Sequence, residues 1–307
     1  ISAVTLSPSV VPVSTNIDEK DFSDREDDAL GLLIKSVSSV LGSGVVVDQQ
    51  GLVATNAHLV SGATEIHVYL HNGHVLDGKV VFQDEGTDLA LIKLPVATPE
   101  ALPFSNNPAL MGDFVLALGK EKEHNTVKAG MISKDFTSLP SKQSVNYFLE
   151  TDFLLSQGYS GGALINSRGE LVGLNVVPVS SEAGASMESY ATPVEFVQAA
   201  VNAVKIGKNQ FQLPELGAQL QSPSSEISQA LGIPNMGGLV VEEISPDGLL
   251  AKSGIEVGDI ILKSGSVFVN NAEVLRYSLV AQQGLGSKTL VYQRNGTIHL
   301  ANLALSN

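Results

Sequence analysis

The sequence predicts a mainly β protein made of two folded units, and three observations support this prediction. The chain has 307 residues, which is enough for about two domains of ordinary size. Between residues 30 and 175, short runs of Val, Ile and Leu alternate with turns rich in Gly, Asn and Asp, as is typical of a β-sandwich or β-barrel. A polar stretch at 205–212 then leads into a second unit with apolar runs of its own.

Composition and charge narrow the class of protein. Hydrophobic residues make up 43% of the chain and charged residues 16%, so the chain has enough apolar surface to fold. Its net charge of −14 repels phosphate backbones and anionic headgroups, and we expect no nucleic-acid partner. The absence of Cys excludes disulfides, thiolate metal sites and a cysteine nucleophile.

The N-terminal region differs from the rest of the chain. Residues 1–30 join a Ser/Val/Pro stretch to a run of carboxylates, and we expect a flexible acidic arm rather than a binding site. The chain starts at Ile1 without a leader-like segment and contains no apolar run of 18 residues, so we expect a soluble chain that has been processed or truncated.

The β-rich segment after the arm divides into strands and one helix. We expect strands at 44–47, 66–70, 89–94 and 114–118, with an Asn-Gly hairpin turn at 72–73. Thr192, Pro193 and Glu195 are typical of a capped helix start, and valines spaced by three or four residues from 194 to 204 form an inward face. In the second unit we expect strands near 239–244 and 260–262, a helix at 272–283 and a last hairpin turn at 295–296.

The strongest chemical signal is the segment 157–162, which reads QGYSGG. A serine hydroxyl is a poor nucleophile that needs a nearby base, and the oxyanion formed on an attacked carbonyl needs preorganised N–H donors. Glycines around Ser160 permit a tight turn that aims the amides of Gly158 and Ser160 into one oxyanion hole. A plain glycine-rich hairpin turn fits the same segment, so residues elsewhere must decide.

Two upstream residues complete a nucleophilic set. His58 closes a strand in TNAH at 55–58, and Asp88 opens the apolar strand that begins at Leu89. A single His or Asp is usually structural. Here His, Asp and Ser occur in that order, each at the edge of a strand, where loops can bring them together as a catalytic triad.

A serine hydrolase of the α/β class is the alternative that the glycine segment raises. That fold requires a helix after the serine, followed by the acid and then the histidine. Here 163–165 leads through a turn into 171–173, which predicts strand, turn and strand, and the last histidine is His299 near the terminus. We therefore reject the α/β-hydrolase fold.

With these motifs assembled, the chain resembles the HtrA/Deg serine proteases from about Leu30 to its end. The matching motifs are GSG at 42–44, TNAH at 55–58, TDLAL at 87–91, and ETD at 150–152 leading to 158–162. Residues 213–305 resemble that family's PDZ domain, with LGA at 216–218 and GIEVGD at 254–259. After the acidic arm at 1–30, the resemblance implies a chymotrypsin-like domain of two six-stranded antiparallel β-barrels at 31–207 and a small α/β PDZ domain at 208–307.

The resemblance also implies roles in the protease domain. His58 is the general base, Asp88 orients and stabilises its imidazolium, Ser160 attacks, and the amides of Gly158 and Ser160 bind the oxyanion. The S1 pocket and the substrate-pairing strand comprise Leu155, Asn175, Val176, Val177, Tyr190 and Ala191. Because no carboxylate lies among them, we expect small or medium apolar P1 residues rather than Lys or Arg.

In the PDZ domain the resemblance implies a peptide groove. Extended peptides would add as a strand along Gly217, Ala218 and Gln219, and amides around Leu216 and Gly217 would receive the terminal carboxylate. Glu215 lies beside this loop and weakens the capture of an anion.

Several residues depart from the family pattern. Tyr159 replaces the usual Asn before the nucleophile, Ser156-Gln157 replaces Asn-Pro, and Gly119-Lys120-Glu121 replaces a Gly-Asn-Pro loop. These departures concern the oxyanion loop more than the triad. Because Tyr159 carries no charge, we expect no zymogen-type insertion of Ile1.

The resemblance implies ATP-independent endoproteolysis of unfolded or mislocalised proteins in the periplasm or cell envelope, by homotrimers or multiples of trimers, without a cofactor or metal. Two alternatives stay open: a non-proteolytic scaffold that binds peptides through its cleft and PDZ domain, and a protease held inactive until a peptide reaches the PDZ domain. His67, His71 and His74 raise the alternative of a hairpin metal site, but exposed polar residues are the simpler interpretation.

Overall fold

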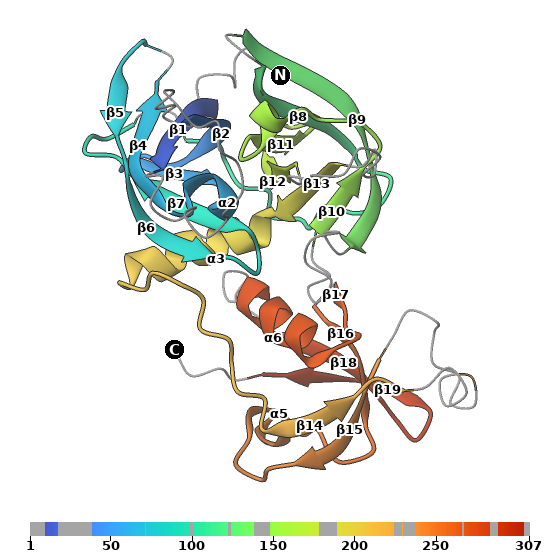
Figure 1. The fold of residues 1–307 in the computed structure, drawn as a ribbon. Helices are drawn as coiled ribbons and strands as arrows, with labels where there is room; N and C mark the ends of the chain where they lie inside the picture. Colours follow the sequence, from blue (N-terminus) through green and yellow to red (C-terminus); the bar gives the residue numbers. More distant parts are fainter. Residues whose placement is uncertain are drawn as a thin grey trace, which may run out of the picture. The chain divides into compact units, whose positions relative to one another are not determined.

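The structure is a computed structural model, and it describes residues 10–17, 39–70, 72–98, 101–121, 124–137, 148–177, 189–223, 229, 238–265, 267–282 and 288–303. The chain divides into two compact units (Figure 1). Unit 1 comprises Ile1–Asp135 and Leu149–Val197, and unit 2 comprises Phe136–Phe148 and Gln198–Asn307. No helix among the described residues is long and apolar enough to cross a membrane.

The first half of unit 1 is a seven-stranded antiparallel sheet with strand order β5-β4-β1-β2-β3-β7-β6. A single short helix, α2 (Ala57–Val60), lies between β3 and β4. The strands are β1 (Val10–Ile17), β2 (Ser39–Asp48), β3 (Leu52–Thr55), β4 (Ala63–Tyr69), β5 (Val75–Asp77), β6 (Lys79–Asp84) and β7 (Leu89–Lys93).

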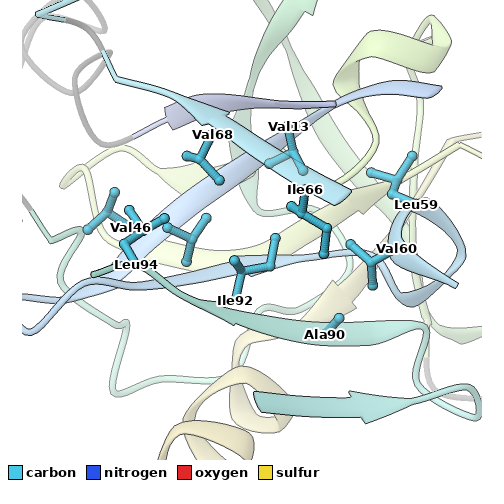
Figure 2. Close-up of a cluster of buried hydrophobic side chains, with 10 residues drawn as sticks. Val13, Val46, Leu59, Val60, Ile66, Val68, Ala90, Ile92 and Leu94 are labelled. Carbon is cyan, nitrogen blue, oxygen red and sulfur yellow. The ribbon is translucent and has the colours of Figure 1, made fainter. Parts of the chain in front are cut away.

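One apolar cluster fills the concave face of this sheet, and Figure 2 shows its side chains pointing toward one another. Val13, Val46, Val68 and Ile92 come from four different strands, and each is at most 2% exposed. Burying branched side chains from several strands removes a large apolar area from water. This cluster therefore holds together the strands whose ends carry the site.

The second half of unit 1 is a closed barrel in the order β10-β13-β12-β11-β8-β9. Leu149, Leu164 and Ala191 come from three of its strands and belong to one buried apolar cluster. Its strands are β8 (Phe114–Glu121), β9 (His124–Thr137), β10 (Phe148–Thr151), β11 (Ala163–Asn166), β12 (Leu171–Val176) and β13 (Ser189–Pro193). The prediction of a six-stranded barrel is confirmed here, whereas the first half has seven strands, and its described residues form a curled sheet rather than a closed ring.

The expectation of a flexible arm is wrong for Val10–Ile17. These residues form β1, which pairs antiparallel with β2 over seven positions and also with β4. The sequence VVPVSTNI lacks charge, so it satisfies its backbone groups inside a sheet instead of in water. The acidic run at 18–30 lies outside the described residues.

The helix that follows β13 is α3 (Val194–Lys205). The predicted helix is therefore present, but its predicted N-cap is wrong, since Pro193 still belongs to β13 and the Thr192 hydroxyl donates to the carbonyl of Thr87 at 2.8 Å. A cap needs the hydroxyl oxygen as an acceptor for a helix amide. Here tertiary structure uses the hydroxyl as a donor instead.

Unit 2 is built on a sheet in the order β14-β15-β16-β18-β19, with β17 paired to β16. Two short helices accompany it, α5 (Leu249–Lys252) and α6 (Ala272–Ala281), and α6 contacts β16 (Figure 1). The strands are β14 (Ala218–Gln221), β15 (Leu239–Ile244), β16 (Ile260–Ser264), β17 (Val267–Phe268), β18 (Thr289–Arg294) and β19 (Thr297–Asn302).

Local signals in unit 2 agree with the sequence. Asn271 caps α6 by accepting a hydrogen bond from the Val274 amide at 2.8 Å. Leu275 and Leu279 of this helix are fully buried. Asn295 and Gly296 both have positive φ, 49° and 78°, as the predicted two-residue hairpin between β18 and β19 requires.

Candidate active site

The ends of two neighbouring strands bring the predicted base and acid together. β3 pairs antiparallel with β7, and Thr55 at the end of β3 lies opposite Ala90 near the start of β7. His58 follows β3 by three residues, and Asp88 directly precedes β7. The sheet register therefore places both residues at one edge.

Asp88 receives two hydrogen bonds from His58. The ring Nδ1 lies 2.7 Å from Asp88 Oδ2, and the backbone amide of His58 donates to Asp88 Oδ1 at 3.0 Å. The Asp88 residue is 3% exposed, whereas the His58 side chain is 28% exposed. A buried carboxylate against Nδ1 keeps the proton on that nitrogen, so Nε2 is left with its lone pair as an acceptor.

The turn that carries Asp88 is tightly bonded. Asp84 Oδ2 accepts from both the amide and the hydroxyl of Thr87 at 2.8 Å, and the Asp88 carbonyl accepts from the Ala57 amide at 3.0 Å. Asp88 itself has φ of +53°. A side chain in that left-handed region costs roughly 1–2 kcal/mol, so surrounding bonds must hold it there.

Ser160 follows the 3₁₀ turn η3 (Gln157–Tyr159) and is fully buried. Its carbonyl accepts from the Ser43 amide of β2 at 2.8 Å, which ties the serine to the first sheet. Gly161 has φ of +78°, and a Cβ there would lie 2.1 Å from the Ser43 carbonyl oxygen and 2.4 Å from Thr55 Oγ1. Only glycine permits this close approach, which brings Ser160 beside the strand that leads to His58.

The predicted nucleophile does not bond the predicted base in this structure. Ser160 Oγ accepts from the Val177 amide at 3.2 Å and donates to the Val177 carbonyl at 3.4 Å. Among the described residues, His58 Nε2 is buried and has no hydrogen-bond partner. The hydroxyl is thus held by β12's exit segment and not by the imidazole.

The oxyanion amides differ from the predicted arrangement. The Ser160 amide donates to the Gln157 carbonyl at 3.0 Å, and the Ser43 hydroxyl donates to the Gly158 carbonyl at 2.7 Å. The first bond closes the 3₁₀ turn, in which amides point back into the turn. The Gln157 carbonyl therefore accepts the hydrogen bond from the Ser160 amide that an oxyanion would accept.

Tyr159, the chief departure from the family pattern, is part of the barrel core. Its side chain is fully buried, and its ring lies against Gly119, where a Cβ would come within 2.6 Å of the ring. Lys128 Nζ lies 5.6 Å from the ring centroid and donates to the Leu154 carbonyl at 2.6 Å. Gly119 thus provides the space that the large ring needs, while Ile1 lies outside the described residues.

The predicted S1 residues surround the same core. Leu155, Val177 and Ala191 all pack in the hydrophobic cluster that contains Tyr159, and the Leu155 amide donates to Ser189 Oγ at 2.9 Å. Asn175 lies opposite Ala191, and Val176 opposite Tyr190, in the β12–β13 ladder. Asn175 is buried, and its amide nitrogen donates to the Leu118 and Ala163 carbonyls at 3.2 and 3.1 Å.

Several residues that shape the site were not predicted from the sequence. Asp84 was detectable, because a carboxylate three residues before Thr87 is typical of an Asx-type turn. Ser43 and Thr192 contact partners 115 and 105 residues away along the chain. Short sequence patterns do not predict hydrogen bonds between residues so far apart in the chain.

The predicted peptide groove in unit 2 has an edge strand at its centre. β14 pairs only with β15 among the described strands, and Gln219 lies opposite Glu243. Glu215 forms an ion pair with Arg276 of α6 at 3.5 Å. Ser222 on the other side of β14 donates to the carbonyl of Asn270, just before α6. These two contacts place β14 alongside α6.

The turn before β14 contains a glycine in the left-handed region of backbone conformation. Gly217 has φ of +68°, and a Cβ there would lie 2.4 Å from the Gly248 Cα. The carbonyls of Leu216 and Gly217 accept from the amides of Leu250 and Ser245. These two carbonyl groups therefore already accept hydrogen bonds from within unit 2.

The histidine hairpin does not gather a metal-binding set among the described residues. His67 Nδ1 lies 2.9 Å from Asp77 Oδ1, and its Nε2 lies 3.6 Å from Glu65 Oε2. The described residues contain no group of three or more suitable side chains that could hold a metal ion. His74 belongs to the turn, where its amide donates to Asn72 Oδ1 at 3.1 Å, and His71 lies outside the described residues.

Comparison with known proteins finds serine proteases. The family model for the trypsin-like peptidase domain matches residues 42–174. The periplasmic serine endoprotease DegP of Escherichia coli K12 is 32% identical over 272 residues, covering 86% of this chain and 56% of DegP. The serine endoprotease DegS of Haemophilus influenzae is 31% identical over 264 residues, covering 82% of this chain and 72% of DegS.

Solved structures of serine proteases are similar to this chain in fold. The HtrA-type protease AlgW with a tripeptide matches with a TM-score of 0.64 and 26% identity, covering 98% of this chain and 94% of that chain. The serine endoprotease from Yersinia pestis matches with a TM-score of 0.52 and 26% identity, covering 97% of this chain and 93% of that chain. The chain spans about half the length of the DegP relatives that it matches.

Proposed function

The chain belongs to the HtrA/Deg family of serine proteases, and we propose that it is an ATP-independent serine endopeptidase that cuts unfolded or mislocalised polypeptides. The observation that carries this proposal is the buried Asp88 carboxylate 2.7 Å from His58 Nδ1, which leaves Nε2 as a buried acceptor. In this proposal residues 31–207 form the protease domain and residues 208–307 the PDZ domain.

The proposed reaction proceeds by acyl transfer. His58 Nε2 takes the proton of Ser160 Oγ as the oxygen attacks the substrate carbonyl carbon, and the carbonyl electron pair becomes an oxyanion. The imidazolium, stabilised by Asp88, then gives its proton to the departing amine. A water molecule repeats the cycle on the acyl-enzyme and releases the second product.

The resting arrangement implies an activation step before this chemistry. The Ser160 hydroxyl must leave Val177 and turn toward His58, and the Gln157 carbonyl must rotate away so that the Gly158 and Ser160 amides converge. The first change needs a rotation of the Ser160 side chain, and the second needs a rotation of the peptide between Gln157 and Gly158. We propose that peptide binding, at the cleft or at the PDZ domain, favours the rotated state.

Substrate specificity follows from the apolar residues near Ser160. An extended substrate would pair with Asn175, Val176 and Val177, and its P1 side chain would meet Leu155 and Ala191. One methylene in an apolar pocket is worth about 1–3 kcal/mol, so the preference among Ala, Val and Leu should be graded. Mass spectrometry of casein digests tests the pocket, and a majority of cuts after Lys or Arg would contradict it.

The PDZ domain is proposed to bind carboxyl-terminal peptides. An added strand would lie along Gly217, Ala218 and Gln219 of the edge strand β14, beside α6. AlgW binds a tripeptide in its solved structure, which supports peptide recognition by relatives of this fold. Calorimetry on the chain should show weaker binding of an apolar-ended peptide when its carboxylate is amidated.

Self-association is proposed through an exposed apolar surface of the second barrel. Phe114 and Met131 face each other across the β8–β9 ladder and are 53% and 48% exposed, and Leu110 and Met111 lie in the adjacent turn with 48% and 66% exposure. Such a patch on one molecule is typical of a protein interface. We propose a homotrimer or a multiple of it, and light scattering should show a smaller species for Phe114→Ser.

The proposed compartment is the periplasm or cell envelope, because several relatives are named periplasmic serine endoproteases. A second function is favoured by the resting oxyanion segment: a peptide-binding scaffold that protects unfolded chains without cutting them. Casein degradation separates the two, since the scaffold leaves casein intact while suppressing its aggregation.

A further inference from the structure

One hydroxyl joins the turn of the catalytic acid to the second barrel. Thr192 lies on β13, is 1% exposed, and donates its hydroxyl hydrogen to the Thr87 carbonyl at 2.8 Å. Thr87 is also buried and directly precedes Asp88. Among the hydrogen bonds that we describe for this turn, this one alone comes from the second barrel.

The bonded carbonyl controls the backbone angle that aims Asp88. The φ angle of a residue is the rotation about its N–Cα bond. It sets the orientation of the preceding peptide plane relative to the residue's own side chain. The Thr87 carbonyl belongs to that preceding plane, and Asp88 has φ of +53°. Holding the carbonyl therefore holds a costly φ angle and, with it, the direction of the carboxylate.

The plane that follows Asp88 is anchored from the other side. The Asp88 carbonyl accepts from the Ala57 amide at 3.0 Å and from Asn56 Nδ2 at 3.3 Å, and these residues immediately precede His58 in the chain. These bonds lie within the first sheet. Thr192 supplies the complementary anchor on the preceding plane.

We propose that Thr192 is a positioning residue of the active site, which couples the S1 strand to the orientation of Asp88. Ala191, its neighbour on β13, lies in the cluster with Leu155. A substrate side chain that settles against this strand thereby acts on the same segment that holds the acid. This inference rests on the proposed function, because it takes Asp88 as the acid of the triad.

The test compares substitutions that remove or keep the donor in the full chain. Thr192→Val keeps the shape of the side chain and removes the hydroxyl, whereas Thr192→Ser keeps the hydroxyl. We expect Val to lower kcat about ten- to a hundredfold with KM unchanged, as is typical of residues that orient a catalytic group, and Ser to retain kcat near the parent value. Thr98→Val is the matched control, because Thr98 is also buried and donates to a backbone carbonyl, that of Asp48, away from the site.

A second readout does not depend on turnover. The His58 Nδ1 proton, bonded to a carboxylate, gives a downfield proton NMR signal that is sensitive to the position of that carboxylate. We expect this signal to shift or broaden in Thr192→Val but not in Thr192→Ser or Thr98→Val. Thr192→Ala, which is smaller and also lacks the donor, takes the place of Val if Val does not fold.

Two results would overturn the inference. One is a folded Thr192→Val or Thr192→Ala protein with the parent's kcat and the parent's NMR signal; the other is a Thr192→Ser protein as impaired as Thr192→Val. If the parent cuts no peptide, the proposed function fails instead, and the NMR comparison still decides the role of Thr192.

Discussion

The two halves of the proposed active site, the acid–base pair and the nucleophile, differ in their hydrogen bonds. The acid–base half is assembled, since His58 and Asp88 share two hydrogen bonds of 2.7 and 3.0 Å. The nucleophile half is not, since the Ser160 hydroxyl is bonded to Val177 and its amide to Gln157. Other elements bond both segments, but the reactive groups differ in their partners. The Asp88 carboxylate accepts from its partner His58, whereas the Ser160 amide closes a 3₁₀ turn onto the Gln157 carbonyl. We infer that activity is controlled at the nucleophile half.

Removing either reactive group should have the largest effect. Ser160→Ala and His58→Ala should each lower kcat on the order of 10⁶-fold, because triad members act as a unit. Casein cleavage with circular dichroism as a folding check measures this. Ser167→Ala, an exposed serine of the same barrel, is the control, and unchanged cleavage by Ser160→Ala would remove Ser160 from the triad.

Asp88→Asn should break the acid–base half alone. The amide presents the wrong hydrogen-bond partner to Nδ1, so the imidazole loses its required tautomer, and kcat should fall on the order of 10⁴-fold. The exposed pair His67–Asp77, with a similar separation of 2.9 Å, offers a matched control. Asp77→Asn should leave kcat unchanged, and equal turnover by Asp88→Asn and Asp77→Asn would disprove the role of Asp88.

The close approach of the two halves at Gly161 predicts a loss of stability. In Gly161→Ala the new Cβ would clash with the Ser43 carbonyl oxygen, and the residue would also have to adopt a φ of +78°. We expect the free energy of unfolding to fall by more than about 2 kcal/mol. Gly62 has φ of +71°, but a Cβ at that position would have no heavy atom within 4 Å.

Gly62→Ala therefore isolates backbone strain and should cost about 1 kcal/mol. Urea unfolding of both variants gives the difference. Equal losses would mean that the two halves are not in the tight contact described here.

A stability effect of pH must be separated from the chemistry of the acid–base half. Burial raises the pKa of Glu195 at the start of α3 to about 7. Because the folded state binds this proton more tightly than the unfolded chain, the stabilisation is fully present below about pH 4, and it is lost as the pH rises to about 7 and above. The change should be on the order of 2 kcal/mol.

Glu195→Gln should flatten this dependence in urea unfolding at about pH 5 and pH 8. Glu273→Gln, at the equivalent first turn of α6 and exposed, should leave the dependence as in the parent. A parent protein equally stable at both pH values would show that Glu195 is solvated.

Much of this site was predictable because its signals are local. The order His58, Asp88 and Ser160, with strand edges and glycines around them, predicts a triad, and the Asn295-Gly296 turn and the helix that begins at Ala272 follow from short patterns. The hydrogen bonds and strand pairings around the site were not predictable. The Ser160–Val177 bond, the Thr192 donor and the pairing of β1 with β2 and β4 depend on contacts between segments distant in sequence, which tertiary packing decides.

Labelling of the serine with a fluorophosphonate probe tests the central claim most directly, since the reaction requires both the base and a serine free to turn. We predict a single adduct on Ser160, formed slowly by the chain alone and faster after addition of an apolar-ended peptide, and absent in His58→Ala. An adduct on another residue, or no adduct on folded protein with or without peptide, would contradict this control of activity at the nucleophile half.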